Sequence, residues 1–258
     1  MSLSTCFKGG LLALFLCFGH QASACEAPKN PPYPPLNVDG GMVVFGMKAV
    51  LEQQGVPNPE MGLSVSFLDC STGVSKFVER LPYIADAGQI QDAFLARTSK
   101  DEQEVFLIHS VPFRASGGVS LGSDYFTVLV YRRTDDGFVQ DKKLTEYFGS
   151  GADIISIRDD DEKTLYSYPF KTQEDIKRQL SSDNYHSWFT GMPIERVVNS
   201  KASIYSMQST SGDTGMYLVK GDRVKQERYS AGWVYILYVT AKKKEIRGWV
   251  LCERINGC

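Results

Sequence analysis

The sequence predicts an α+β fold that is mainly β, in which an N-terminal region of antiparallel sheets with few helices precedes a small β-barrel. The strongest observation is the segment from Ala202 to Cys252, where four short runs of β-branched and aromatic residues are separated by turn residues. Such runs are typical of a small antiparallel barrel. Upstream, short apolar runs and hairpin turns outnumber helical patterns, so strands are expected to dominate there too.

Residues 1–24 have the pattern of a secretory signal peptide. Lys8 supplies a positive charge, an apolar run covers Gly9–Gly19, and Ala22-Ser23-Ala24 is a typical cleavage site. The apolar run is shorter than the roughly 20 residues that a membrane-spanning helix needs. We therefore expect a periplasmic or secreted protein without a transmembrane segment. Residues 25–37 follow as a proline-rich leader, because repeated prolines exclude a helix interior.

The cysteines of the mature chain suggest two disulfides. They are Cys25, Cys70, Cys252 and Cys258, and an even number in an exported protein favours pairing. Sequence alone does not choose among the pairings, but Cys252 with Cys258 would close a short loop and leave Cys25 to pin the leader to Cys70. Lipoprotein anchoring through Cys25 is the alternative. The sequence lacks a C-x-x-C motif and its histidines are isolated, so neither a metal site nor a cofactor is expected.

Charge divides the chain near Ser200. Residues 25–200 carry 17 Lys and Arg against 25 Asp and Glu, a net charge of −8, whereas residues 201–258 carry 10 against 5, a net of +5. This change of sign predicts an α+β domain of unknown family over 38–199 and a second domain over 201–258. The opposite charges either help the two domains dock or leave the basic one free for an anionic partner such as a cell-wall polymer. Nucleic acid is not an expected partner for an exported chain with this small a charge.

Patterns of apolar residues and turn signals predict the elements of the first region in order. Helices are expected at Phe45–Gln54, at Gln89–Ala96 and after Thr172, which can cap a helix beginning at Gln173 and ending before Ser181–Asn184. Strands are expected at Leu63–Phe67, Val74–Arg80, Val105–His109, Phe126–Tyr131, Phe138–Leu144 and Ile154–Ile157, and Ile194–Val198 is either a last strand or the lead into the domain boundary. Gly149-Ser150-Gly151 is interpreted as a turn rather than a phosphate loop, and Asp159–Glu162 as a solvated turn rather than a calcium site.

Residues 201–255 resemble the bacterial SH3-like (SH3b) domain. The residues that carry the resemblance are Ala202–Tyr205, Tyr217–Val224 with its Lys-Gly turn, Gly232-Trp233-Val234-Tyr235-Ile236 and Gly248-Trp249-Val250. The family's usual Asn-Val-Arg opening is absent, and the polar loop Ser206–Gly215 stands in its place. The resemblance implies a small barrel whose aromatic residues pack its core or lie near a ligand surface. The candidates are Tyr205, Tyr217, Trp233, Tyr235 and Trp249.

A second, weak similarity covers residues 125–148. Their order of aromatic strand, acidic turn and returning strand is similar to hairpins of exported inhibitor and immunity proteins that protect bacteria against wall hydrolases. No catalytic motif accompanies it: His109 and Ser110 are adjacent, and neighbouring strand residues point to opposite faces. We therefore expect an exported, non-enzymatic binding protein that recognises a protein partner, with a peptidoglycan-binding protein of the cell envelope as the alternative.

Overall fold

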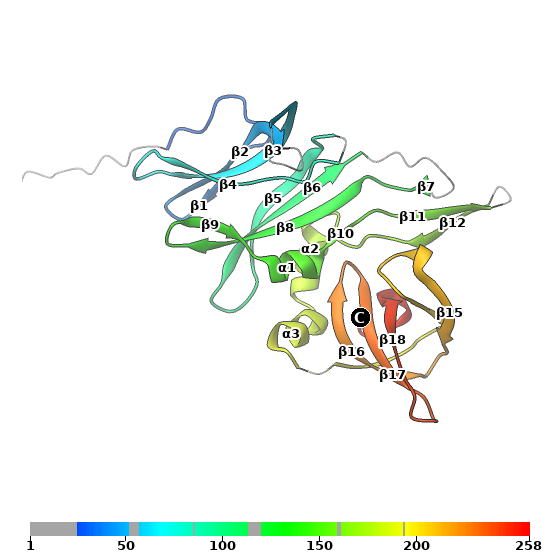
Figure 1. The fold of residues 1–258 in the computed structure, drawn as a ribbon. Coiled ribbons are helices and arrows are strands. Elements are labelled where there is room, and N and C mark those ends of the chain that lie inside the picture. Colours follow the sequence, from blue (N-terminus) through cyan, green and yellow to red (C-terminus); the bar gives the residue numbers. More distant parts are fainter. Residues whose placement is uncertain (1–24, 52–56, 85, 113–119, 159–160, 193) are drawn as a thin grey trace, which may run out of the picture.

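The computed structural model describes residues 25–51, 57–84, 86–112, 120–158, 161–192 and 194–258 (Figure 1). Over these ranges the chain forms four antiparallel sheets and three α-helices, which confirms the mainly β class that the sequence predicts. The predicted signal peptide, residues 1–24, lies outside the described residues. None of the helices in these ranges has the length and apolar character needed to cross a membrane.

Two sheets of the N-terminal region pack face to face. The first contains β1 (Leu36–Val38), β2 (Gly41–Leu51), β3 (Pro57–Asp69) and β4 (Ser75–Arg80), in that order. The second has the order β10-β8-β6-β5 with β9 beside β8, and its strands are β5 (Gln89–Arg97), β6 (Gln103–Val111), β8 (Tyr125–Thr134), β9 (Gly137–Gln140) and β10 (Ser150–Gly151). Phe45 and Leu107 meet in a buried cluster between them. The other face of β6, with Phe106, belongs to a second cluster, so the second sheet is buried on both faces.

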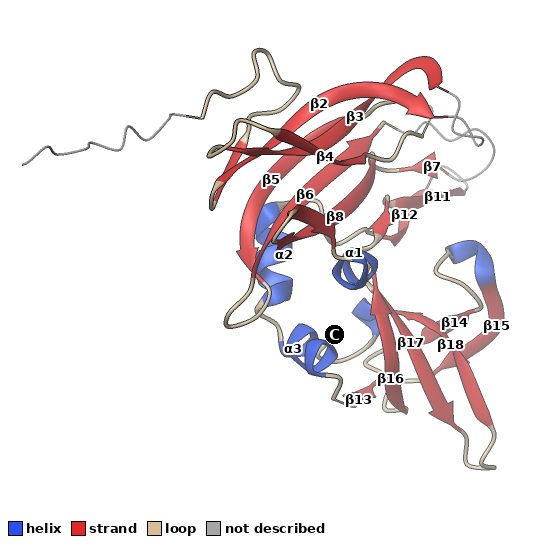
Figure 2. Cartoon of the chain, turned by 60° about the vertical axis from the view of Figure 1, so that its left-hand side comes forward, coloured by secondary structure: helices blue, strands red, loops and turns tan. Residues whose placement is uncertain are grey.

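Three helices and a small third sheet complete this region. The third sheet contains β7 (Ser120–Leu121), β11 (Ile154–Arg158) and β12 (Asp161–Tyr166). The helices are α1 (Lys142–Phe148), α2 (Gln173–Leu180) and α3 (Asp183–Thr190). Figure 2 shows the helices between the second sheet and the C-terminal strands. The predicted cap of α2 is confirmed, because the Thr172 hydroxyl accepts the Asp175 amide at 3.2 Å.

The C-terminal strands form an open sheet. Its members are β13 (Ile194–Val197), β14 (Ala202–Tyr205), β15 (Asp213–Leu218), β16 (Arg223–Ser230), β17 (Trp233–Val239) and β18 (Glu245–Leu251). Their order is β13-β16-β17-β18-β14-β15, with β13 and β15 at the two ends. The predicted barrel is therefore not confirmed, since the sheet does not close within the described residues. A 3₁₀ turn, Cys252–Arg254, follows β18 and leads to an antiparallel bridge between Val198 and Ile255.

The C-terminal sheet shares its core with the region before it. The second buried cluster contains Phe106 of β6 and Tyr147 of α1 as well as Trp233 and Val250 of the C-terminal sheet. In addition, β13 precedes Ser200 in the chain and yet pairs with β16. Common apolar burial therefore holds the two parts together. The division of the chain at Ser200 stays a prediction.

Two predicted helices are wrong. Phe45 lies in β2 opposite Val65, and Phe94 lies in β5 opposite Phe106. The first segment contains apolar residues at helical spacing, but pairing with β3 and β6 holds both segments as extended strands. Residues 52–54 of the first predicted helix lie outside the described residues.

The segment after β9 also differs from the prediction. The predicted strand Phe138–Leu144 ends at Gln140, and α1 begins beyond it because the Asp141 carboxylate accepts the Leu144 amide at 2.9 Å. Ser150 and Gly151, predicted as part of a turn, pair with β8 instead. The helix α3 was not predicted. Its N-cap is Ser182, whose hydroxyl accepts the Tyr185 amide at 3.0 Å.

The solvated turn predicted at Asp159–Glu162 is described only in part. Residues 159–160 lie outside the described residues, and residues 161–162 open β12. The strands predicted at Leu63–Phe67 and Val74–Arg80 pair as β3 and β4, and the strand predicted at Phe126–Tyr131 lies in β8, which pairs with β9.

Both disulfides agree with the pairing considered from the sequence. Cys25 pairs with Cys70 at a Cα separation of 5.0 Å, and Cys252 pairs with Cys258 at 5.3 Å. The first joins the proline-rich leader to the end of the β3 strand. The second fastens the chain end to the 3₁₀ turn after β18. Such bonds are compatible with an oxidising location.

Candidate functional site

An open groove of about 880 Å³ lies at the junction between the N-terminal region and the C-terminal sheet. Its lining residues come from α1, α3 and the strands β7, β8, β10, β11 and β12 on one side and from β16, β17 and β18 on the other. Seven of the lining side chains are aromatic, and they include all three tryptophans of the chain, Trp188, Trp233 and Trp249. This volume and this apolar character are typical of ligand sites.

Hydrogen bonds fix α1 against β16 beside the groove. The Ser230 hydroxyl donates to the Glu146 carbonyl at 2.6 Å, and the Ala231 amide donates to the Tyr147 carbonyl at 3.1 Å. These carbonyls belong to the last turn of α1, where a helix leaves its acceptors without internal partners. The two walls of the groove are therefore held by one set of bonds.

Aromatic rings in tilted contact form the floor of the groove. The ring of Tyr147 lies 4.2 Å from that of Trp188 and 4.6 Å from that of Tyr229, and Tyr166 lies 5.3 Å from Trp233, measured between ring centroids. Burial raises the pKa of the Tyr147 and Tyr166 hydroxyls, so both are neutral near pH 7. They already have partners, because Gln179 donates to the Tyr147 hydroxyl at 2.6 Å and Tyr166 donates to the Ala231 carbonyl. Tyr147, Tyr166, Tyr229 and Trp233 are buried, so Trp188 is the ring of this floor that a ligand can cover most fully.

Charged residues line the rim. Lys143 Nζ lies 4.7 Å from the centroid of the Trp188 ring. On the opposite wall, Arg228 Cζ lies 5.3 Å from the centroid of Trp249 and 4.2 Å from that of Tyr235. A cation within about 6 Å of an aromatic face is attracted by the ring. Each wall therefore carries a cation held on a tryptophan.

The structure brings together four of the five aromatic residues singled out in the sequence. Trp233 and Trp249 line the groove, Tyr235 packs 5.2 Å from Trp249, and Tyr205 packs edge-on 5.2 Å from Trp233. Tyr217 is different, because its side chain is 56% exposed and its ring lies 4.4 Å from the Lys201 ammonium.

The N-terminal wall was not predicted from the sequence. Lys143 and Glu146 come from α1, and Trp188 comes from α3. The caps Asp141 and Ser182 were the available signals for these helices, since Asp and Ser favour helix N-termini.

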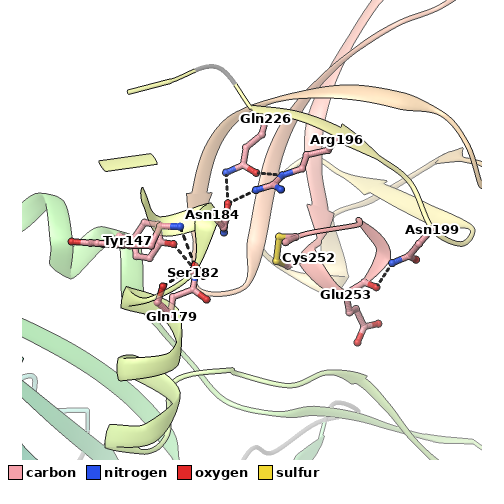
Figure 3. The surroundings of a disulfide bond; sticks show 11 residues. Tyr147, Gln179, Ser182, Asn184, Arg196, Asn199, Gln226, Cys252 and Glu253 are labelled. Carbon is pink, nitrogen blue, oxygen red and sulfur yellow. Dashed lines mark hydrogen bonds between the residues drawn. A yellow bond between two sulfur atoms is a disulfide. The ribbon is translucent and has the colours of Figure 1, made fainter. Parts of the chain in front are cut away.

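A buried polar network fastens α3 to the C-terminal sheet (Figure 3). Asn184 Oδ1 accepts from Arg196 Nη2 at 2.6 Å and from Gln226 Nε2 at 3.1 Å, and Arg196 Nε donates to Gln226 Oε1 at 3.1 Å. Burial lowers the pKa of Arg196 from its ordinary value, although the group stays charged near pH 7. The network sets the position of α3 and, with it, that of Trp188.

The histidines and the serine hydroxyl of Ser150 can be placed relative to the groove. Of its described lining residues none is histidine, and the Ser150 hydroxyl is bonded to that of Tyr125 at 2.9 Å. His109 is fully buried elsewhere with Nε2 2.9 Å from the Ala87 carbonyl, and burial lowers its pKa so that the ring is neutral. Within the described ranges no group of three or more His, Cys, Asp or Glu could hold a metal ion.

Comparisons of the chain with protein-family models, with curated proteins and with solved structures find no match. The groove and its chemistry are therefore the basis for assigning a function.

Proposed function

We propose that this chain is an exported, non-enzymatic binding protein that recognises a partner protein through the groove at its junction, in the manner of an inhibitor or immunity protein. The observation that carries this proposal is the aromatic groove with an arginine and a lysine on its rim. Tryptophan, tyrosine and arginine are the residues most enriched at the energetic centres of protein interfaces. Export is supported by the two disulfides, which persist in oxidising compartments.

The SH3-like reading of residues 201–255 is part of the same proposal. Support comes from the succession of short strands β16, β17 and β18, from the turn at Gly221, and from Trp233 and Trp249 on the adjacent strands β17 and β18, where Trp249 stands opposite Tyr235. In this reading the C-terminal sheet is an open variant of the barrel. Its remaining apolar face is covered by α1 and α3 instead of by its own strands.

Peptidoglycan binding is the second candidate. It is favoured by the net charge of +5 over residues 201–258 and by aromatic faces on which sugar rings can stack. In this case the protein would hold the cell wall with the same groove.

One experiment separates the two candidates. Purified residues 25–258, with both disulfides formed, are incubated with isolated cell wall and, separately, with an extract of exported bacterial proteins. We expect capture of a protein, lost in Trp188→Ala and kept in Tyr217→Ala, whose exposed ring lies outside the groove. Capture of wall material that is lost in Trp188→Ala would favour the second candidate. Binding that is unchanged in Trp188→Ala would contradict any role for the groove.

A further inference from the structure

The two rim cations of the groove have no anionic partner among the described residues. Ion pairs there join Lys171 to Asp153, Arg178 to Asp175, Arg247 to Glu227 and Glu245, and Arg254 to Glu253. Lys143 and Arg228 belong to none of these pairs, and both are exposed. Each instead lies over aromatic rings, Lys143 over Trp188 and Arg228 over Tyr235 and Trp249. An aromatic face restrains a cation without neutralising it, so both charges stay available to a ligand.

The opposite net charges of the two regions are also not paired with each other in ion pairs. None of the ion pairs named above links residues on either side of Ser200, and the junction is held by apolar packing and by hydrogen bonds to α1 and α3. The sequence left two interpretations of this charge pattern, docking of the two regions on each other or binding of an anionic partner. No ion pair supports the first. The net charge of +5 of residues 201–258 is left for a partner.

Glu146 restricts the kind of anion that fits. It lines the same groove from α1, is exposed, and makes no ion pair or side-chain hydrogen bond among the described residues. A polymer with a continuous row of negative charges would meet repulsion there. A ligand with separate carboxylates around an apolar centre avoids that repulsion and can also cover the aromatic floor.

We propose that the groove binds an extended acidic segment of a partner protein, with an apolar side chain against the aromatic floor at Trp188 and carboxylates at Lys143 and Arg228. This inference rests on the proposed function, because it names the partner chemistry of the same site. The argument rests on charge complementarity, because two cations without an ion-pair partner among the described residues line the same apolar groove.

The test uses residues 25–258 and three synthetic peptides that share a central Leu-Phe pair. The pair is flanked by Asp and Glu in the first peptide, by Asn and Gln in the second and by Lys in the third. Intrinsic fluorescence reports binding directly, since every tryptophan of the chain lines the groove. We expect the acidic peptide to bind at least about tenfold more tightly than the neutral one, with an affinity that falls as salt rises.

Charge-removing variants locate the contacts. Lys143→Gln and Arg228→Gln should each weaken binding of the acidic peptide about three- to tenfold, and Glu146→Gln should tighten it. Lys142→Gln on the same helix and Lys225→Gln on the same strand are matched controls, because both are exposed and neither lines the groove. These controls should leave the affinity unchanged.

Three results would overturn the inference: equal binding of the neutral peptide, no effect of the two groove variants, or no fluorescence change with any peptide. The proposed function would survive each of them if a partner protein is still captured by the chain and lost in Trp188→Ala. The two conclusions therefore fail separately.

Discussion

The amide nitrogen of Ala231 donates a hydrogen bond of 3.1 Å to the carbonyl oxygen of Tyr147, and so joins the turn between β16 and β17 to the end of α1. Neighbouring carbonyls of α1 are satisfied in the same way, because Ser230 donates to Glu146 and the Tyr168 hydroxyl donates to Phe148 at 3.1 Å. Helix ends need such partners. In this chain residues distant in sequence supply them, so the geometry of the groove depends on long-range contacts.

Gly149, directly after α1, is the most constrained position beside this contact. Its φ of +61° and ψ of −153° fall in a region that is essentially restricted to glycine. A Cβ atom there would also lie 3.0 Å from the Ala231 Cβ. We expect Gly149→Ala to lower the free energy of unfolding by about 2–3 kcal/mol, measured by urea unfolding followed by tryptophan fluorescence.

Gly191→Ala is the matched control for Gly149→Ala. Gly191 also ends a helix with positive φ, at +70°, but a Cβ there meets nothing within 4 Å. Its expected cost is about 1 kcal/mol, from the backbone alone. If both variants lose the same amount, the close approach of Gly149 to Ala231 does not matter for stability.

The sequence predicts the strands of this fold better than its helices. Val105–His109 and Phe126–Tyr131 are dense apolar runs, and both are buried strands as predicted. The predicted helix at Phe45–Gln54 is wrong because Val44, Met47 and Leu51 happen to lie at helical spacing, while pairing with β3 decides the structure. Tertiary pairing of this kind cannot be read from local spacing.

The sequence predicted residues on only one of the two walls of the groove. Trp233 and Trp249 were singled out by a resemblance, and both line the groove. Lys143 and Trp188 lie on short helices of seven and eight residues, whose stability depends on packing rather than on local propensity. The only local signals for these two helices are their N-cap residues, Asp141 and Ser182. The wall of the groove that they form could therefore not be predicted.

Asn184 is expected to hold α3 in place. Removing its acceptor by Asn184→Ala would leave the donors of Arg196 and Gln226 without this partner in a buried site. We expect a loss of about 2–3 kcal/mol in urea unfolding and a shift in tryptophan emission, because Trp188 follows on the same helix. Asn199→Ala is the control, since Asn199 donates from an exposed position to the Glu253 carbonyl, and it should cost less than about 1 kcal/mol.

The two disulfides should contribute unequally to stability. They span 45 and 6 residues, and closing the longer loop removes more entropy from the unfolded chain. By that relation the paired replacement of Cys25 and Cys70 by Ser should cost about 4 kcal/mol, and that of Cys252 and Cys258 about 2 kcal/mol. Thermal unfolding of the two double variants measures the difference. A larger loss from the shorter loop would contradict this reasoning. The intact mass of the mature protein shows whether Cys25 is free to pair with Cys70, because lipidation of Cys25 would add the mass of acyl chains.

Glu104 should make stability depend on pH. Its side chain is buried on β6, its Oε2 has no hydrogen-bond partner, and burial together with Asp141 and Glu102 raises its pKa from 4.5 to about 7, with Arg132 opposing. The folded protein therefore holds this proton more tightly than the unfolded chain. Stability should fall as pH rises from about 4.5 to about 7 and then level off, by about 3 kcal/mol in total.

Glu104→Gln removes this titration and keeps the shape of the side chain. At pH 8 the variant should be more stable than the wild-type chain by about 2–3 kcal/mol, and at pH 4.5 the two should be nearly equal, in urea unfolding at each pH. His109 titrates in both proteins, so its opposite effect at low pH cancels in the comparison. Glu102→Gln, at an exposed neighbouring position, should change the pH dependence much less. A difference between Glu104→Gln and wild type that stays constant from pH 4.5 to 8 would show that Glu104 keeps its charge when buried.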